Sequence, residues 1–303
     1  MHQRGENMSR SRFEMMKIIK KELINEFDEK FNSGDIVLFK DINNMLKYNK
    51  LFSVLPNVTR VKDLIKFLVE NKVLIPFKHQ LSKNKSTTKY SFREIHKYKT
   101  PLKLRGKSFL SHYTAMYLHN LTENVPKNVY TNQEQSKKPS NKNYNLQQKN
   151  IDRAFSKPMR KTNNIAFFDN FSAYMLNGKN TERMGVTEIE VDGELLPVTD
   201  IERSLLDVSI RPGYGGGVEE ILKAFTNAKG KISINRLLAY LRKMDYIYPY
   251  HQVLGFYLEK AGYKESQLKL LESMDIEYKF YLNYNMKNPS FSERWKLYYP
   301  QHL

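Results

Sequence analysis

The sequence predicts an α+β protein with two domains, and three observations support that prediction. Its 303 residues correspond to about two domains at ~150 residues each, and 40% of them are hydrophobic, which is enough for packed cores. Segments with apolar residues at helical spacing are separated by short β-branched or alternating runs. The net charge of +18 is unevenly distributed, which indicates parts with different roles.

The first predicted domain covers residues 12–95 and has the element order of a winged helix-turn-helix. An apolar face follows the first helix until Ser33-Gly34 ends it, and Asp41 is placed to cap the second helix. The third helix buries one stripe against the other two, and Val58 is predicted to lie on that stripe. The predicted elements are helices over 12–31, 41–48 and 58–71 with a short β-branched run at 36–39, then strands over 73–77 and 87–92 joined by a polar hairpin at 82–86.

In such a domain the third helix presents its outward face to the major groove, and the hairpin lies beside the phosphates. Double-stranded DNA is therefore the predicted partner of this domain. The alternatives are a small helical domain whose lysines only solvate it, or a winged helix used for protein interaction. The predicted DNA contacts are Asn57, Thr59, Arg60, Lys62, Lys66, Lys83, Lys85 and Lys89.

The distribution of charge supports a polyanion-binding first half. Residues 1–110 carry 24 basic and 11 acidic side chains, a net charge of +13, and residues 111–160 carry 8 and 3, a net charge of +5. Residues 161–303 carry 18 of each. A basic part joined to a neutral one indicates a nucleic-acid-binding module. The alternative is a solvated, lysine-rich surface that reflects an AT-rich genome.

The second predicted domain, residues 100–303, mixes strands and helices. Asp192-Gly193 is a strong turn signal between two strands. Residues 132–150 are predicted to be a long loop or a disordered insertion, because they are mostly Asn, Gln, Lys and Ser. The other predicted elements are a helix over 108–121, strands over 128–131, 165–168, 187–191 and 195–198, helices over 200–210, 218–228, 234–244, 249–261 and 265–274 that form a bundle, and closing strands over 278–284 and 294–299.

Three blocks of this second domain resemble the AbiE-type antitoxins of the AbiEi family. The middle block is the most recognisable, and the blocks occur in the family's order behind a winged helix. The likeness covers about residues 14–263. The matching runs are 111–121 followed by Pro126 and a strand; 198–207 followed by Arg211-Pro212 and 215–220; and 254–259 followed by Gly262.

The resemblance implies an antitoxin of a type IV toxin–antitoxin, abortive-infection system. It implies a transcriptional autorepressor that binds the operator of its own operon through the winged helix, and an antitoxin domain behind it. The implied functional partner is a nucleotidyltransferase-like toxin, whose neutralisation in the family does not require a stable complex. The polar insertion and the tyrosine-rich tail after residue 263 depart from the family pattern. The motif residues expected to shape the antitoxin domain are Glu202, Arg203, Asp207, Arg211, Gly216 and Gly217.

The sequence contains no pattern that indicates a catalytic centre, a cofactor or a metal site. His112 and His119 are seven residues apart on one predicted helix, so they are interpreted as packed histidines and not as zinc ligands. The glycine-rich run 213–217 lacks the Lys-Ser/Thr of a phosphate-binding loop and is interpreted as a structural turn.

Two sets of charged residues were weighed as sites and are interpreted structurally. Glu188 and Glu190 share one face of a strand, and a solvated strand is the simpler interpretation. Asp207 and Arg211 are four residues apart on a helix, which predicts an ion pair that orients the glycine-rich turn.

The sequence has no cysteine and no apolar run of the ~20 residues that a membrane span needs. It therefore predicts a cytoplasmic protein without disulfides. Two other functions remain open: a winged-helix interaction or sensor module of a defence system without operator binding, and a nucleic-acid-processing enzyme. The sequence also leaves open whether DNA is bound by a monomer or a dimer.

Overall fold

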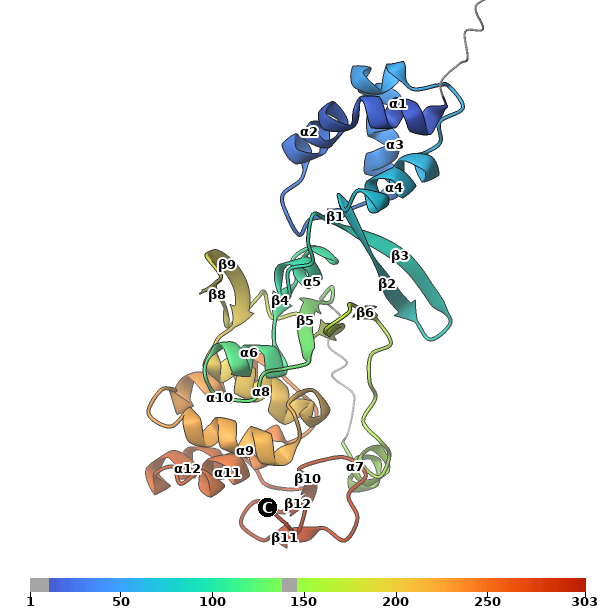
Figure 1. Cartoon of the computed structure of the whole chain (residues 1–303). Coiled ribbons are helices and arrows are strands. Elements are labelled where there is room, and N and C mark those ends of the chain that lie inside the picture. The colour runs from blue at the N-terminus through green and yellow to red at the C-terminus, as the bar shows by residue number, and fades with distance from the viewer. Residues whose placement is uncertain (1–10, 138–145) are drawn as a thin grey trace, which may run out of the picture. The chain divides into compact units, whose positions relative to one another are not determined.

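The computed structural model describes residues 11–137 and 146–303 of a mixed α/β chain that divides into two compact units (Figure 1). Unit 1 consists of the residues through Leu104 together with Ala166–Asp169. Unit 2 consists of Arg105–Ile165 and Asn170–Leu303. The sequence alone placed the division at residues 95–100 and did not anticipate the short return segment.

Unit 1 combines a cluster of helices with the antiparallel strands β1, β2 and β3. The strand order is β1-β3-β2, and β2 and β3 form a long hairpin (Figure 1). Leu23, Ile42 and Leu64 lie at the centre of the core that the helices share. The elements are α1 (Arg12–Ile18), α2 (Lys20–Lys30), β1 (Ile36–Val37), α3 (Phe39–Tyr48), a short 3-10 helix (Lys50–Val54), α4 (Val61–Glu70), β2 (Leu74–Ser82), β3 (Lys85–Phe92) and α5 (Lys99–Lys103).

Three details of unit 1 differ from the sequence-based expectations. The single helix predicted over 12–31 is broken at Ile19, whose backbone leaves the helical region. Asp41 lies in the first turn of α3, where its carboxylate accepts a hydrogen bond from the Leu38 amide at 3.0 Å, so it is not the N-cap residue. The third helix begins at Val61 because residues before it form a turn, and Val58 is exposed, not buried in the core.

The sheet of unit 2 contains both parallel and antiparallel pairs. The strand order is β7-β5-β4-β9-β8; β5 is parallel to β7 and β4 to β9. The Asp192-Gly193 turn joins β8 to β9 as predicted, with both residues at positive φ. The strands are β4 (Phe109–Leu110), β5 (Asn128–Glu134), β7 (Ser172–Gly178), β8 (Val186–Val191) and β9 (Glu194–Thr199), and β6 (Ile165–Phe167) lies where the chain passes between the units.

Helices α6 and α7 are inserted between strands of this sheet and α8 to α12 follow it; together they pack around one large core, and a small sheet with the order β10-β12-β11 closes the chain. The tail beyond residue 263 is part of that core, because Phe280, Trp295 and Leu297 are fully buried in it. The remaining elements are α6 (His112–Leu118), α7 (Gln148–Phe155), α8 (Ile201–Ile210), a 3-10 helix (Pro212–Tyr214), α9 (Val218–Asn227), α10 (Ile234–Met244), α11 (Tyr250–Lys260), α12 (Glu265–Glu272), β10 (Phe280–Tyr281), β11 (Ser290–Ser292) and β12 (Leu297–Tyr299).

Unit 2 also corrects the sequence-based expectations in two places. The helix predicted over 108–121 is the short strand β4 followed by α6. The polar insertion predicted over 132–150 is shorter, since β5 extends to Glu134 and α7 begins at Gln148; its residues 138–145 lie outside the described residues.

Within residues 11–137 and 146–303, none of the helices combines the length and the hydropathy that crossing a bilayer requires.

Candidate nucleic-acid interface and a basic cavity

The β2–β3 hairpin of unit 1 ends in exposed lysines. Lys83 lies in the two-residue turn, Lys85 follows it as the first residue of β3, and both are exposed. Lys89 lies further along β3, opposite Phe77, and is half-buried. Burial lowers the pKa of Lys89 from its usual value. The hairpin tip therefore presents two solvated ammonium groups, with a third, partly desolvated one behind them.

Residues 58–60, which lead into α4, are not helical, although the sequence placed them on the recognition helix. Asn57 and Arg60 are exposed. Thr59 is half-buried, and its hydroxyl oxygen is buried without a hydrogen-bond partner among the described residues. Arg60 is the N-cap residue, and its amide donates to the Asp63 carboxylate at 2.9 Å. Asp63 also pairs with Arg12 at 3.3 Å, which ties the start of α4 to α1.

The two lysines of α4 lie in different surroundings. Lys62, in the first turn, is exposed. Lys66, one turn later, lies 3.9 Å from Glu70 and places its ammonium 5.7 Å from the centre of the Phe13 ring of α1. Six of the eight predicted contacts are thus exposed: Asn57, Arg60, Lys62, Lys66, Lys83 and Lys85.

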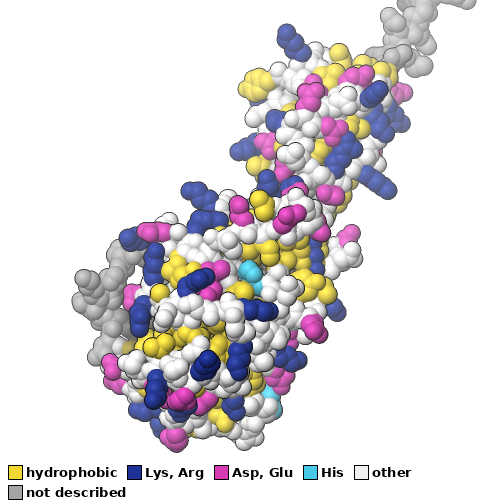
Figure 2. Space-filling model, turned by 90° about the vertical axis from the view of Figure 1, so that its left-hand side faces the viewer, with side chains coloured by type: hydrophobic (Ala, Val, Ile, Leu, Met, Phe, Trp, Pro, Cys, Tyr) yellow, Lys and Arg dark blue, Asp and Glu magenta, His cyan; other side chains and the backbone are white. Residues whose placement is uncertain are grey.

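Basic side chains are not gathered into one continuous area on the face of the molecule that Figure 2 shows. Lysine and arginine side chains are distributed over both units there and are interspersed with acidic ones. The candidate interface of unit 1 is therefore defined by its elements, the start of α4 and the tip of the β2–β3 hairpin.

The charged motif of α8 in unit 2 is buried and paired. Arg203 donates through Nε to Asp207 at 2.9 Å, and the two residues are 1% and 5% exposed. Arg203 also donates to the Thr181 hydroxyl and the Met184 carbonyl. Burial disfavours the charged guanidinium, but the Asp207 carboxylate outweighs this effect and raises the pKa of Arg203.

The predicted ion pair between Asp207 and Arg211 is therefore wrong. The Asp207 carboxylate is held by Arg203 one turn earlier in the helix, whereas Arg211 donates to the backbone carbonyl of Asn177 at 3.2 Å. Positions four residues before and four residues after an aspartate are both close to it on a helix. Here the buried guanidinium is the one that neutralises it.

The other motif residues connect secondary-structure elements of unit 2. Glu202 is buried and accepts a hydrogen bond at 2.9 Å from the amide of Ser233, the N-cap residue of α10. Gly216 and Gly217 have φ values of 83° and 99°, which L side chains rarely adopt. A Cβ atom on Gly216 would lie 2.6 Å from the ring of Tyr113. The glycine-rich run is thus a structural turn.

The two histidines considered in the sequence analysis are hydrogen-bonded within the fold, and the two strand carboxylates are exposed to solvent. His112 is buried, its Nδ1 lies 2.9 Å from the Ser111 hydroxyl, and burial lowers its pKa to about 4. His119 lies 2.6 Å through Nε2 from the Thr199 carbonyl. Glu188 and Glu190 are exposed. In the part of the chain that the structure describes, no group of three His, Asp or Glu side chains is arranged to hold a metal ion.

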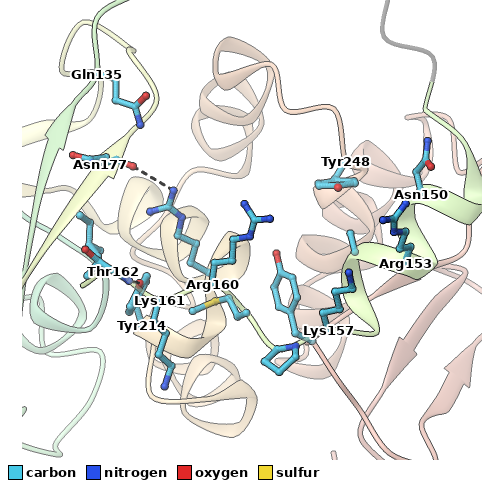
Figure 3. Close-up of a pocket in the computed structure, with 16 residues that line it drawn as sticks. Gln135, Asn150, Arg153, Lys157, Arg160, Lys161, Thr162, Asn177, Tyr214 and Tyr248 are labelled. Carbon is cyan, nitrogen blue, oxygen red and sulfur yellow. Dashed lines mark hydrogen bonds between the residues drawn. The ribbon is translucent and has the colours of Figure 1, made fainter. Parts of the chain in front are cut away.

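Unit 2 contains a cavity of about 1030 Å³ that the sequence did not reveal (Figure 3). Tyr248, Asn150 and Arg153 lie on one side of it, and Gln135, Asn177 and Thr162 lie on the other. Its lining includes five cationic side chains and no acidic one. These cations are Arg153, Lys157, Arg160, Lys161 and Arg211.

The cations of the cavity come from segments that are distant in the sequence. Arg153 is in the last turn of α7, three more follow in residues 157–161, and Arg211 follows the end of α8. The net charge of +5 over residues 111–160 was the available sequence signal. It could not place Arg211 or the tyrosines beside those cations, because that proximity depends on the fold.

Comparison with known proteins shows the fold but no family. No protein-family model matches the chain, and no curated protein matches it. The crystal structure of the RV2827C protein from Mycobacterium tuberculosis is similar, with a TM-score of 0.57 and 10% sequence identity. The match covers 91% of this chain and 89% of that chain. At this identity the likeness concerns the fold alone, so the chain shares the overall fold of the RV2827C protein over most of its length.

Proposed function

We propose that unit 1 is a winged helix-turn-helix that binds double-stranded DNA, with α4 in the major groove and the β2–β3 hairpin against the phosphates. The observation that carries this proposal is the order of elements: helices α1 to α4 precede a hairpin whose strands form an antiparallel sheet in the order β1-β3-β2. This order places one amphipathic helix and one basic hairpin in the same small domain.

The exposed residues divide the expected contacts into two classes. Arg60 and Lys62 lie at the start of α4, where recognition helices contact base edges, and Asn57 lies just before them. Lys83 and Lys85 lie on the hairpin, where they would neutralise phosphates without reading sequence. Lys66 contributes less in this proposal, because Glu70 and the Phe13 ring engage its ammonium group.

We further propose that the chain is a transcriptional autorepressor and the antitoxin of a type IV toxin–antitoxin operon. This step is supported by the resemblance of three sequence blocks to AbiEi antitoxins. The residues of those blocks connect elements of unit 2, as Glu202 does for α8 and α10. No catalytic role is assigned to any of them, and the proposed function is therefore not enzymatic.

DNA binding by the full-length protein to the region upstream of its own gene tests the first proposal. Arg60→Ala together with Lys62→Ala is expected to reduce discrimination between that region and scrambled DNA, by ~1–3 kcal/mol for each lost base contact. Lys21→Ala, on the exposed face of α2, is the matched control and should leave discrimination unchanged. Equal discrimination by the wild type and the double variant would exclude α4 as the recognition helix.

Growth assays with the neighbouring gene test the antitoxin proposal separately. The Arg60→Ala/Lys62→Ala variant, expressed from an independent promoter, is expected to rescue cells from a nucleotidyltransferase-like toxin although it no longer represses. Failure of the wild-type chain to rescue growth would leave a winged-helix module without antitoxin activity. Rescue only by repressing variants would mean that antitoxicity is transcriptional.

A further inference from the structure

We propose that the basic cavity of unit 2 binds a nucleoside triphosphate. Its lining carries five cations and no carboxylate. Among residues 11–137 and 146–303, neither an ion pair nor a hydrogen bond engages the charged ends of Arg153, Lys157, Arg160 or Lys161. A concave surface lined by one sign of charge concentrates field lines and attracts counter-ions. The ligand must therefore be anionic.

The placement of the cations favours a chain of phosphates over a single anion. They belong to three segments, α7, residues 157–161 and the residue that follows α8. Three of the five are arginines, whose planar guanidinium groups match phosphate oxygens in pairs. Several phosphate groups in a row can contact cations on separate segments, whereas one phosphate contacts only those on its own side.

The uncharged residues of the cavity suit a base and a sugar. Tyr214, Tyr248 and Tyr284 line it and offer flat aromatic surfaces, on which nucleobases stack. Asn150 and Gln135 carry amides that both donate and accept hydrogen bonds, as base edges require. The volume of about 1030 Å³ is at the upper end of the usual range for small-molecule sites and accommodates a nucleotide.

The walls of the cavity are held in place by contacts that do not need a ligand. The Tyr284 ring stacks on Phe155 of α7 with their centres 4.4 Å apart. The Thr162 amide donates to the Tyr214 hydroxyl at 2.7 Å, and the Thr162 hydroxyl donates to the Met175 carbonyl at 3.1 Å. These contacts fix both ends of the segment that carries Lys157, Arg160 and Lys161, so the site is largely preformed, which lowers the entropic cost of binding.

Isothermal titration calorimetry of the full-length protein with ATP tests this proposal. We expect one saturable site, and Arg153→Gln with Arg160→Gln should weaken it about tenfold or more, because each loses a charge-assisted hydrogen bond. The matched control is Arg242→Gln with Lys269→Gln, two exposed cations of unit 2 outside the cavity, which should leave the affinity unchanged. All four replaced side chains are exposed, so unfolding midpoints should agree with that of the wild type.

Inorganic tripolyphosphate separates recognition of the phosphates from recognition of the base. Tripolyphosphate should bind more weakly than ATP. Tyr248→Leu and Asn150→Ala should lower the affinity for ATP but not the affinity for tripolyphosphate. Tyr248→Phe keeps the aromatic ring and should bind ATP with wild-type affinity. Three results would overturn the proposal: no saturable ATP binding, equal effects of the cavity and control variants, or equal affinities for ATP and tripolyphosphate. A fourth result would also overturn the proposal: a single-stranded oligonucleotide that binds through Arg153 and Arg160 and is not displaced by ATP. The cavity would then be a site for a nucleic-acid strand.

Discussion

The charged residues selected from the sequence have opposite environments in the two units. In unit 1, Arg60, Lys62 and Lys83 are exposed, so their charged ends are available to a partner. In unit 2, Arg203 and Asp207 neutralise each other out of contact with water. Charged residues therefore lie at the surface in one unit and pair inside the core in the other. Loss of activity on mutating the α8 motif would thus not by itself identify a binding residue.

The largest change in stability is expected from Asp207→Asn, which tests whether the buried pair of unit 2 is structural. The substitution leaves the Arg203 guanidinium buried without its counter-charge, which should lower the free energy of unfolding of unit 2 by ~3–5 kcal/mol. Urea denaturation followed by circular dichroism measures it. Glu188→Gln, which removes an exposed carboxylate from the same unit, is the control and should change stability by less than ~0.5 kcal/mol.

A double variant tests whether the destabilisation by Asp207→Asn comes from an unpaired buried charge or from lost local contacts. Arg203→Met combined with Asp207→Leu removes both charges, so it should be less destabilising than Asp207→Asn alone. If the double variant is the less stable one, the hydrogen bonds of Arg203 to Thr181 and Met184 matter more than charge neutralisation.

The second prediction concerns the pH dependence of unit 2. Because burial lowers the pKa of folded His112 to about 4, below its usual value of 6.5, the folded state favours the neutral ring. The unfolded ring takes up a proton below pH 6.5, whereas the buried ring does so only near pH 4. The free energy of unfolding therefore keeps its full value above pH 6.5 and falls, by up to about 3 kcal/mol, as the pH is lowered from 6.5 to about 4. His112→Asn, which tolerates the positive φ at this position, should flatten the stability profile in that interval.

The exposed His302 provides the comparison for this experiment. His302→Asn should retain the acid-side loss of stability that His112→Asn removes. Identical profiles for the wild type and His112→Asn between pH 6.5 and 4 would contradict a buried neutral imidazole at this position.

The smallest effect is expected from the hairpin of unit 1. Lys83→Gln with Lys85→Gln should lower the affinity for specific and for scrambled DNA by the same factor. It should also reduce the slope of log affinity against log salt concentration by about 2. Circular dichroism should show no change of fold, because both side chains are exposed. Lys21→Gln with Lys47→Gln, on α2 and α3, is the matched pair; an equal change of slope for this pair would place the phosphate contacts elsewhere.

Hydrophobic periodicity predicted most helices of unit 2 and their caps. The helix over 234–244 with Ser233 as N-cap and the helix that ends before Gly262 are both confirmed. Local signals failed where the structure depends on distant partners. β7 was missed because its alternation is weak and its parallel pairing with β5 lies outside the reach of sequence patterns. α7 was missed because polar residues surround its few apolar ones, Ile151 and Phe155, which the tail buries.

The candidate sites show the same limit. Exposure of Lys62, Lys83 and Lys85 followed from the helix and hairpin patterns, since the outward face of an amphipathic element is defined by its own period. Which of two neighbours pairs with Asp207 did not follow, because helical spacing is symmetric and only burial selects Arg203. The cavity depended entirely on tertiary structure, which brings Tyr248 near Arg153 across nearly one hundred residues of chain (Figure 3).

The single tryptophan of the chain, Trp295, packs against Gly255 of α11. A Cβ atom there would lie 2.2 Å from the indole ring of Trp295, so a larger residue at 255 would displace it. The indole is fully buried and donates to Glu259 at 2.8 Å. Because unit 1 contains no tryptophan, intrinsic indole fluorescence reports on unit 2 alone. It therefore gives a label-free optical signal for the docking of the C-terminal segment, even while the other unit unfolds or binds DNA.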